Sequence, residues 1–317
     1  MSVSAPGATI TRTSTMDPQI EARLDMVPAL RSRHLVEELT GGITNRNFKV
    51  STPEGDFVAR VSTPDGAMLA IDRDAEHRNS VAAEQSGAGA PVVDYVPEAG
   101  ILVVRFLEGT TFTDDDVRLP ANLPRIAQAC RRLHAGPRFV NDFNMFRIQE
   151  SYLSLVTERG FRLPDGYGSY ATSVAAMERA LLLHPEPTVP CNNDLLAGNM
   201  IDDGDRLWLI DYEYAGNNDA CFELGNIWSE AALPVPLLDD LVGSYYGRQS
   251  PRLVARARLW GLMSKYGWTL WASIQQATSA IDFDFWTWGM EKYDRAVHEF
   301  DGPDFTRLLE EASAPDD

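Results

Sequence analysis

The stretch that decides how this chain folds covers residues 191–214 and reads C-N-N-D-L-L-A-G-N-M-I-D-D-G-D-R-L-W-L-I-D-Y-E-Y. Asp194 precedes Asn199 by five residues, and a D-D-G turn then leads into an apolar run that ends at Asp211. Such a pattern predicts a loop, a strand, a tight turn and a second strand, with polar side chains at both strand ends. We therefore expect Asp194, Asn199 and Asp211 to converge on one point.

These three residue types suit phosphoryl transfer from ATP. In that reaction one carboxylate accepts the proton of the attacking hydroxyl, while an amide oxygen and a second carboxylate hold Mg²⁺ on the phosphates. The catalytic loop of protein kinases has the same Asp-to-Asn spacing, and its metal-binding Asp follows after a short hairpin. A lone D-x-x-x-x-N motif is nevertheless common by chance, and D-D-G-D is ordinary turn sequence. The spacing alone therefore leaves a plain surface turn open.

The residues from Asp211 onward narrow this choice, because they read D-Y-E-Y-A-G-N-N-D-A-C-F-E-L-G-N. Together with N-D-L-L-A-G-N, this string resembles the bacterial choline/ethanolamine kinases, a branch of the aminoglycoside-phosphotransferase-like kinases. That family carries H-N-D-L-x-x-x-N, then I-D-F/Y-E-Y, then F-D-I/L-G-N. The resemblance implies Asp194 as the catalytic base or hydroxyl orienter, Asn199 and Asp211 as Mg²⁺ ligands, and ATP as phosphoryl donor. Glu213 is implied as a further contact of the metal or the substrate pocket.

The chain departs from the family pattern at two positions. Asn192 stands where the family usually has His, and Glu223 stands where it usually has Asp. The family His orients the loop rather than reacting, so Asn192 raises the alternative of a catalytically weak nucleotide- or choline-binding protein. Degenerate kinases tend to lose the base or the metal ligands, and all three are present here. An active enzyme is therefore the expectation.

The nucleotide-binding half is expected before residue 107. Residues 40–50 read T-G-G-I-T-N-R-N-F-K-V, and paired glycines between strands can bring backbone N–H groups close to phosphate oxygens. A hairpin turn has the same composition, but in context the segment resembles the nucleotide loop of bacterial choline kinase-like proteins. The resemblance also implies a strand Arg on the phosphates, its helix Glu partner, and backbone contacts to adenine. The expected nucleotide-binding residues are Gly41, Gly42, Thr44, Asn45, Arg60, Glu76, Phe106 and Glu108.

The substrate end is expected near the C-terminus. Trp268 and Trp271 share one face of a helix predicted over residues 253–276, and Trp288 follows shortly after. Spacing alone favours core packing for the first two. The segment resembles the family's W-x-x-W-x-x-x-Q, and that resemblance implies a choline pocket of these three indoles with Glu230 as counter-charge. An indole cage holds a quaternary ammonium by cation–π contacts, so choline is expected to bind better than ethanolamine.

One wall of the implied pocket is missing from the sequence. The family's further pocket Tyr falls at Val235, and Tyr245 or Tyr246 are the candidates to replace it. The alternative substrate class within the fold is an aminoglycoside, which would favour an acidic, open cleft over an indole cage. The expected partner is thus a small cationic alcohol.

Composition bounds the remaining possibilities. The 317 residues carry a formal net charge of −18, which opposes binding to nucleic acid or to anionic membranes. A charge of this sign would favour the approach of a cationic substrate, and it is equally consistent with a role in solubility alone. The three cysteines show no C-x-x-C spacing. The polar first 16 residues lack the apolar core of a secretory signal, and no apolar run approaches the length of a membrane span. We expect a cytoplasmic protein, and the sequence leaves its oligomeric state open.

The fold expected from these features is the two-lobed, protein-kinase-like α+β fold. Residues 1–16 are predicted to be a disordered tail, and residues 17–107 a small antiparallel-sheet lobe that binds the nucleotide. Residues 108–317 are predicted to form a larger helical lobe with the catalytic loop and the substrate pocket. The expected function is ATP-dependent phosphorylation of a small amino alcohol, choline or ethanolamine.

Overall fold

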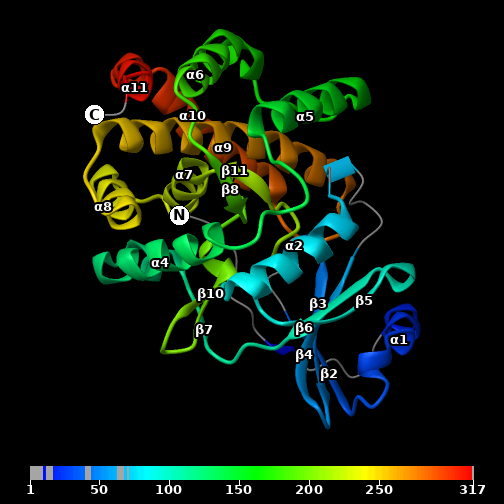
Figure 1. The fold of residues 1–317 in the computed structure, drawn as a ribbon. Helices are drawn as coiled ribbons and strands as arrows, with labels where there is room; N and C mark the ends of the chain where they lie inside the picture. Colours follow the sequence, from blue (N-terminus) through cyan, green and yellow to red (C-terminus); the bar gives the residue numbers. More distant parts are fainter. Residues whose placement is uncertain (1–9, 12–16, 40–43, 63–67, 70, 316–317) are drawn as a thin grey trace.

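The computed structural model describes residues 10–11, 17–39, 44–62, 68–69 and 71–315, and combines an antiparallel sheet with a larger helical region (Figure 1). The sheet has six strands in the order β1-β2-β3-β4-β6-β5, and every neighbouring pair is antiparallel. This is the predicted fold class. The strands are β1 (Ile10–Thr11), β2 (Leu35–Leu39), β3 (Arg46–Thr52), β4 (Gly55–Val61), β5 (Val92–Val96) and β6 (Ile101–Arg105).

Side chains alternate along β4 between a buried, apolar face of the sheet and a less buried face. Phe57, Ala59 and Val61 are buried, and Arg60 lies between them on the opposite face. The apolar face packs against Ile20 and Leu24 of helix α1 (Pro18–Asp25), which forms a small core of its own. Arg60 is thereby directed away from this core, toward the helical region.

Helix α2 (Arg73–Ser86) connects the sheet to the rest of the protein. The Asp72 side chain accepts a hydrogen bond from Ala75 N at 3.0 Å and so caps the start of the helix. The helix ends at Gly87, whose φ of +76° suits a residue without a Cβ. Ala83 belongs to the large core of the helical region rather than to the core of the sheet.

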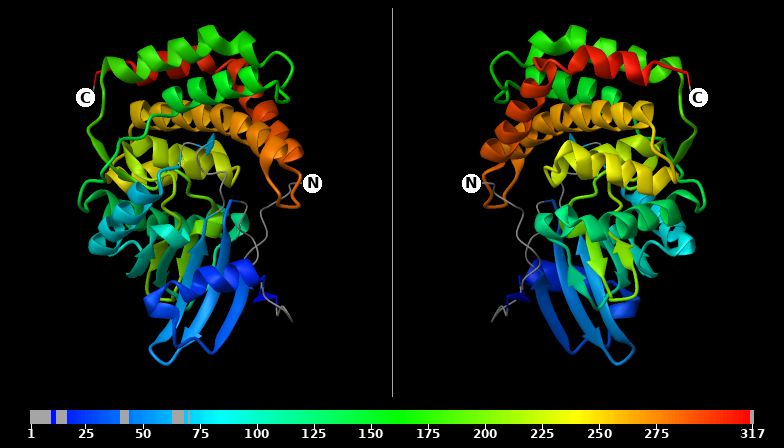
Figure 2. Two further views of the ribbon diagram at one scale, coloured as in Figure 1. Left: turned by 90° about the vertical axis from the view of Figure 1, so that its right-hand side faces the viewer. Right: turned by 90° about the vertical axis from the view of Figure 1, so that its left-hand side faces the viewer.

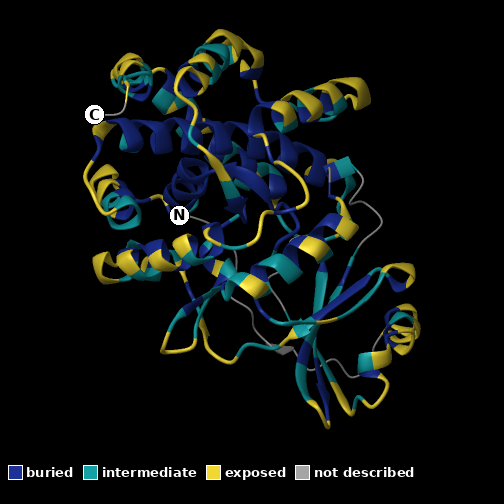
Figure 3. Cartoon of the chain, viewed as in Figure 1, coloured by how far each residue is buried: buried dark blue, intermediate teal, exposed yellow. Residues whose placement is uncertain are grey.

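Helix α9 (Pro251–Thr278) is the buried centre of the helical region (Figures 2 and 3). Helices pack around it, and α7 approaches so closely that a Cβ on Gly225 would lie 2.1 Å from the Ala257 carbonyl oxygen. The other helices are α3 (Asp114–Arg118), α4 (Leu123–His134), α5 (Met145–Arg159), α6 (Ala171–Leu183), α7 (Ala220–Glu230), α8 (Val235–Tyr246), α10 (Phe285–Phe300) and α11 (Phe305–Ala312).

Short strands carry the central loops of the helical region. The hairpin β9 (Met200–Asp202) and β10 (Leu207–Leu209) is antiparallel, as expected, and β9 also pairs with β7 (Thr110–Thr111). Strand β8 (Thr188–Cys191) pairs with β11 (Gly216–Asp219). These pairings position the two ends of the stretch 191–214 side by side.

Some expectations differ in detail or lie outside the described residues. A 3₁₀ turn, Pro120–Asn122, precedes α4. Within the predicted tail 1–16 only Ile10–Thr11 are described, and they pair with β2 as a strand. The lobe boundary at residue 107 stays a prediction; it falls between β6 and β7. None of the described helices combines the length and apolar character needed to cross a bilayer.

Candidate active site

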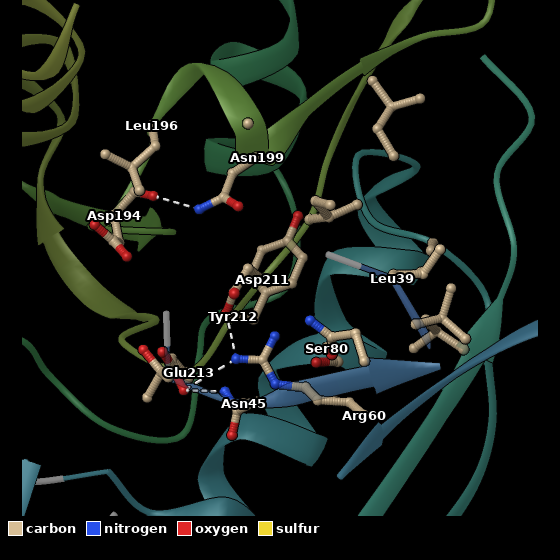
Figure 4. Close-up of a pocket in the computed structure, with 18 of the residues that line it drawn as sticks. Leu39, Asn45, Arg60, Ser80, Asp194, Leu196, Asn199, Asp211, Tyr212 and Glu213 are labelled. Carbon is tan, nitrogen blue, oxygen red and sulfur yellow. Dashed lines mark hydrogen bonds and ion pairs between the residues drawn. The ribbon is translucent and has the colours of Figure 1, made fainter. Parts of the chain in front are cut away.

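The three residues expected to converge all line one cavity of about 370 Å³ between the sheet and the helical region (Figure 4). Asp194 lies in the loop after β8, and Asn199 ends the 3₁₀ turn Ala197–Asn199. Asp211 follows β10 in the left-handed region, with φ of 65°. The Asn199 side-chain amide donates to the Asp194 carbonyl oxygen at 2.8 Å, which ties the two ends of the loop together.

The Glu223 side chain supports the loop that carries Asp194. This fully buried carboxylate accepts hydrogen bonds from the backbone N–H groups of Asn192, at 2.9 Å, and Asn193, at 2.8 Å. Asn193 has φ of 68°, and its side-chain amide bonds the carbonyl oxygens of Tyr214 and Gly216 at 3.0 and 3.2 Å. The Glu at position 223 therefore retains a carboxylate that fixes an otherwise unfavourable loop conformation.

Glu223 is also part of a buried group of potential metal ligands with His134 and Cys191, whose ligand atoms lie within 4.8 Å of one another. Burial raises the pKa of the Cys191 thiol well above its usual range, so the thiol keeps its proton while no metal is bound. Because Glu223 already accepts two backbone hydrogen bonds, we interpret the group as support for the loop.

The electrostatics of the cavity suit a proton acceptor. Burial raises the pKa of the Asp194 carboxyl well above its usual range, and the carboxylates of Glu230, Asp211 and Glu213 add to the rise. Burial likewise raises the pKa of Glu213, with Asp211 adding to this effect and Arg60 opposing it. A carboxylate surrounded by other carboxylates binds a proton more readily than an isolated one, which favours Asp194 as the acceptor.

Arg60 lies at the centre of the acidic cluster. Its Nη2 is 2.6 Å from Asp211 Oδ1 and 2.9 Å from Glu213 Oε2, and its Nε is 2.8 Å from Glu76 Oε1. The structure thus brings together Arg60 and Glu76, the expected ion pair. Arg73 was not anticipated: it contacts Glu76 at 2.7 Å and Glu213 at 3.2 Å. Its position three residues before Glu76 on one helix was the available signal.

Only some of the other residues expected to contact the nucleotide line the cavity. Thr44 and Asn45 line the cavity, and the Asn45 amide donates to Glu213 Oε2 at 2.8 Å. Phe106 also lines it, but its N–H donates to the Asp56 carbonyl oxygen at 3.0 Å and is therefore engaged within the sheet. Glu108 is exposed and is not among the lining residues, whereas its neighbours Leu107 and Gly109 are. Gly41 and Gly42 lie outside the described residues.

The three expected indoles line the same cavity. Trp268, Trp271 and Trp288 all line it, and the ring centroids of Trp271 and Trp288 are 5.5 Å apart. Tyr214, which was not anticipated, lines it too and accepts a hydrogen bond from Trp271 Nε1 at 2.8 Å. The aromatic wall is therefore continuous with the D-Y-E-Y segment that follows β10.

Three candidate substrate contacts, Glu230, Tyr245 and Tyr246, do not line the cavity. Glu230 is buried outside the lining of the cavity and forms an ion pair with Lys292. Tyr245 and Tyr246, the candidates to replace the pocket Tyr, bond His134 Nδ1 and Cys221 Sγ between α8 and its neighbours. Neither is among the residues that line the cavity. Tyr214 supplies the additional aromatic wall instead.

The side chains in the cavity fit a Mg²⁺ ion. The Asn199 amide nitrogen is committed to the Asp194 carbonyl, so the amide presents its oxygen as the remaining ligand atom. Asp211 adds a carboxylate, and oxygen donors of these two kinds are what Mg²⁺ prefers. When bound with a nucleotide, the ion neutralises charge on the phosphates.

The fold and this cavity define a class of protein. Solved aminoglycoside phosphotransferases share the arrangement: the streptomycin–ATP–APH(2″)-IIa ternary complex superposes with a TM-score of 0.61 over 89% of this chain and 97% of that one, at 15% identity. The chain thus has the two-lobed, protein-kinase-like fold of the small-molecule phosphotransferases.

The particular family follows from closer matches. The choline/ethanolamine kinase family profile matches residues 36–238, and the chain belongs to this family. Protein LicA of Haemophilus influenzae is 29% identical over 214 residues, which cover 65% of this chain and 61% of that protein. Mouse ethanolamine kinase 2 is 27% identical over 80% of this chain and 73% of its own length.

A solved structure agrees with this assignment. A choline/ethanolamine kinase family protein from Mesorhizobium loti is 28% identical, with a TM-score of 0.81 over 92% of this chain and 98% of that one. Membership in the family places the chain among the phosphotransferases that act on an alcohol group of a small molecule.

Proposed function

We propose that this protein uses Mg²⁺ and ATP to phosphorylate the hydroxyl group of a small amino alcohol of the choline and ethanolamine type. The observation that supports this most strongly is the cavity itself, which is lined both by Asp194, Asn199 and Asp211 and by three indole rings. The first set supplies the groups that phosphoryl transfer needs, and the indoles supply aromatic faces suited to a small cation.

In this proposal each residue acts on a defined atom. Asp194 accepts a hydrogen bond from the acceptor hydroxyl and takes its proton as the oxygen attacks the γ-phosphorus and the bond to the β-phosphate oxygen breaks. Asn199 and Asp211 hold Mg²⁺ through their side-chain oxygens. Arg60, held by Glu76, is directed to the phosphates, which would replace Asp211 as its partner.

The alternatives receive less support. The aminoglycoside phosphotransferases share the fold at low identity, and the aromatic wall suits a compact cation better than a large sugar. A catalytically weak binding protein was suggested by Asn192. This residue nevertheless bonds the backbone of the loop at several points, and the expected base and metal ligands are all in place.

The test is turnover. Purified protein with Mg²⁺ and ATP should release ADP when supplied with ethanolamine, N-methylethanolamine, N,N-dimethylethanolamine or choline. It should not do so with aminoglycosides. Asp194→Asn, tested under the same conditions, corrects for background ATP hydrolysis. Turnover with aminoglycosides alone, or with none of these acceptors, would contradict the proposed function.

A further inference from the structure

The ammonium group of Lys292 contacts two of the residues expected to bind a substrate ammonium, Trp288 and Glu230, although Lys292 itself does not line the cavity. Its Nζ is 4.1 Å from the centre of the Trp288 ring and pairs with the carboxylate of Glu230. Lys292 and Trp288 are one turn apart on α10, so the contact is built into the helix. The Lys292 and Glu230 side chains are each only 5% exposed.

Lys292 contacts both the aromatic and the acidic member of the expected cation site, Trp288 and Glu230. The Trp288 ring borders the cavity, but its contact with Lys292 already supplies the cation over that indole. Glu230 does not border the cavity, and its charge is balanced by Lys292. A substrate cation therefore meets a neutral pair at this position rather than an open carboxylate.

A comparison of the buried ion pair with a single cation–π contact indicates that a quaternary ammonium does not displace Lys292. Breaking a buried ion pair by removing one partner is disfavoured on the order of 10²- to 10³-fold. One cation–π contact contributes about 2- to 30-fold in return. The exchange is therefore unfavourable, and the lysine stays in place.

Loss of this cation site weakens the binding of a quaternary ammonium acceptor more than that of a primary amine. A trimethylammonium group has no N–H, so it depends on aromatic faces and on a nearby carboxylate. A primary ammonium has three N–H donors and can bond the oxygen-bearing side chains that line the cavity, which include Tyr214 and Glu213. Without the Trp288–Glu230 site, the primary amine keeps more of its binding than the quaternary one.

We propose that Lys292 is a specificity-determining residue, a tethered cation that disfavours quaternary ammonium acceptors and makes a primary amino alcohol the better substrate. This inference rests on the proposed function and refines its substrate class. It reverses the order expected from the sequence, in which the indoles favoured choline.

Removing the tethered charge should open the site to choline. In Lys292→Met, Glu230 and the Trp288 ring become available, and kcat/KM for choline relative to ethanolamine should rise by about fivefold or more, mainly through KM. The double variant Glu230→Gln/Lys292→Met removes both charges and should lose most of that gain. Equal ratios in wild type and Lys292→Met would overturn the proposal.

The chain offers a matched control outside the cavity. Lys265, like Lys292, is buried and does not line the cavity; it lies 4.1 Å from the centre of the Trp228 ring and pairs with Glu299. The difference is that Trp228, unlike Trp288, does not line the cavity. Lys265→Met should therefore leave the choline-to-ethanolamine ratio unchanged. A rise in this variant equal to that in Lys292→Met would assign the effect to general loosening and overturn the proposal.

Two measurements keep the proposal testable if a variant folds poorly or turnover is absent. In wild type, KM should be lower for ethanolamine than for choline, and the opposite order contradicts the role of Lys292. Binding of each alcohol can be followed without turnover by calorimetry, where Lys292→Met should gain affinity for choline. If no alcohol is phosphorylated but this gain is found, the proposed reaction fails while the assignment of Lys292 stands.

Discussion

The side-chain amide of Asn192 donates a hydrogen bond to the backbone carbonyl of Asp211 at 2.7 Å. A second bond reaches the Ile210 carbonyl at 3.1 Å, and the Asn192 side-chain oxygen accepts from Asp194 N at 3.1 Å. One buried amide therefore links the loop of the proposed base to the strand end of the proposed metal ligand. Asp211 adopts φ of 65°, a conformation that costs on the order of 1–3 kcal/mol and requires such support.

Asn192→Ala should impair this link, because two backbone carbonyls and one N–H lose a buried partner. Each unsatisfied group costs about 1–3 kcal/mol, so we expect a lower melting temperature and at least a tenfold lower kcat. Asn192→His restores the family residue and should leave kcat within about an order of magnitude of wild type. Steady-state kinetics and thermal unfolding check both variants. A far larger gain with His would favour the weak-enzyme alternative.

Asp194→Asn should abolish turnover, since the amide cannot accept the proton of the acceptor hydroxyl. General bases contribute about 10²–10⁴-fold, and kcat should fall by at least that much while affinity for ATP is nearly unchanged. Kinetics with the best acceptor and nucleotide titration measure the two quantities. A variant that keeps half of the activity would exclude Asp194 as the base.

Asp211→Ala should remove the Mg²⁺-dependent part of nucleotide binding. Thermal shifts with MgATP and with ATP plus chelator should become similar in this variant but differ in wild type. Asp205→Ala is the matched control, because Asp205 lies exposed in the turn between β9 and β10, away from the cavity lining. If Asp211→Ala retains the full Mg²⁺-dependent shift, another residue holds the metal.

Lys265 should make stability depend on pH. Burial lowers its pKa to about 8 from the usual 10.5, although Glu299 opposes the shift. Between these values the unfolded chain retains a proton that the folded protein has released, so the contribution of Lys265 to stability rises with pH. The unfolding free energy of wild type, taken relative to that of Lys265→Met, should rise by on the order of 2 kcal/mol from pH 7 to pH 10. A difference that stays constant in urea unfolding across this range would contradict the shift.

Gly225→Ala should destabilise the helical region. A Cβ at this position would lie 2.1 Å from the Ala257 carbonyl oxygen, so α7 and α9 must separate to admit it. Overpacking of this kind costs about 1–3 kcal/mol. Gly168→Ala is the control, since a Cβ there meets no described atom within 4 Å. Equal melting temperatures for the two variants would show that the helices adjust freely.

Local patterns in the sequence determined the elements that present the site. The turn residues of 202–204 predicted the β9–β10 hairpin, because turn preferences act over a few residues. The spacing of Trp268 and Trp271 likewise predicted a shared helix face, and both indoles line the cavity. Their role in binding a substrate stays a prediction.

Contacts between distant segments were decided only by the tertiary structure. Glu230 and Lys292 are 62 residues apart, and nothing in either segment shows that α7 and α10 bring them together. Arg73 and Glu213, which are 140 residues apart, form their contact in the same way. The charge available to a substrate depends on which ionic groups neutralise one another. That pairing follows from how the helices and strands pack rather than from the periodicity of any one of them.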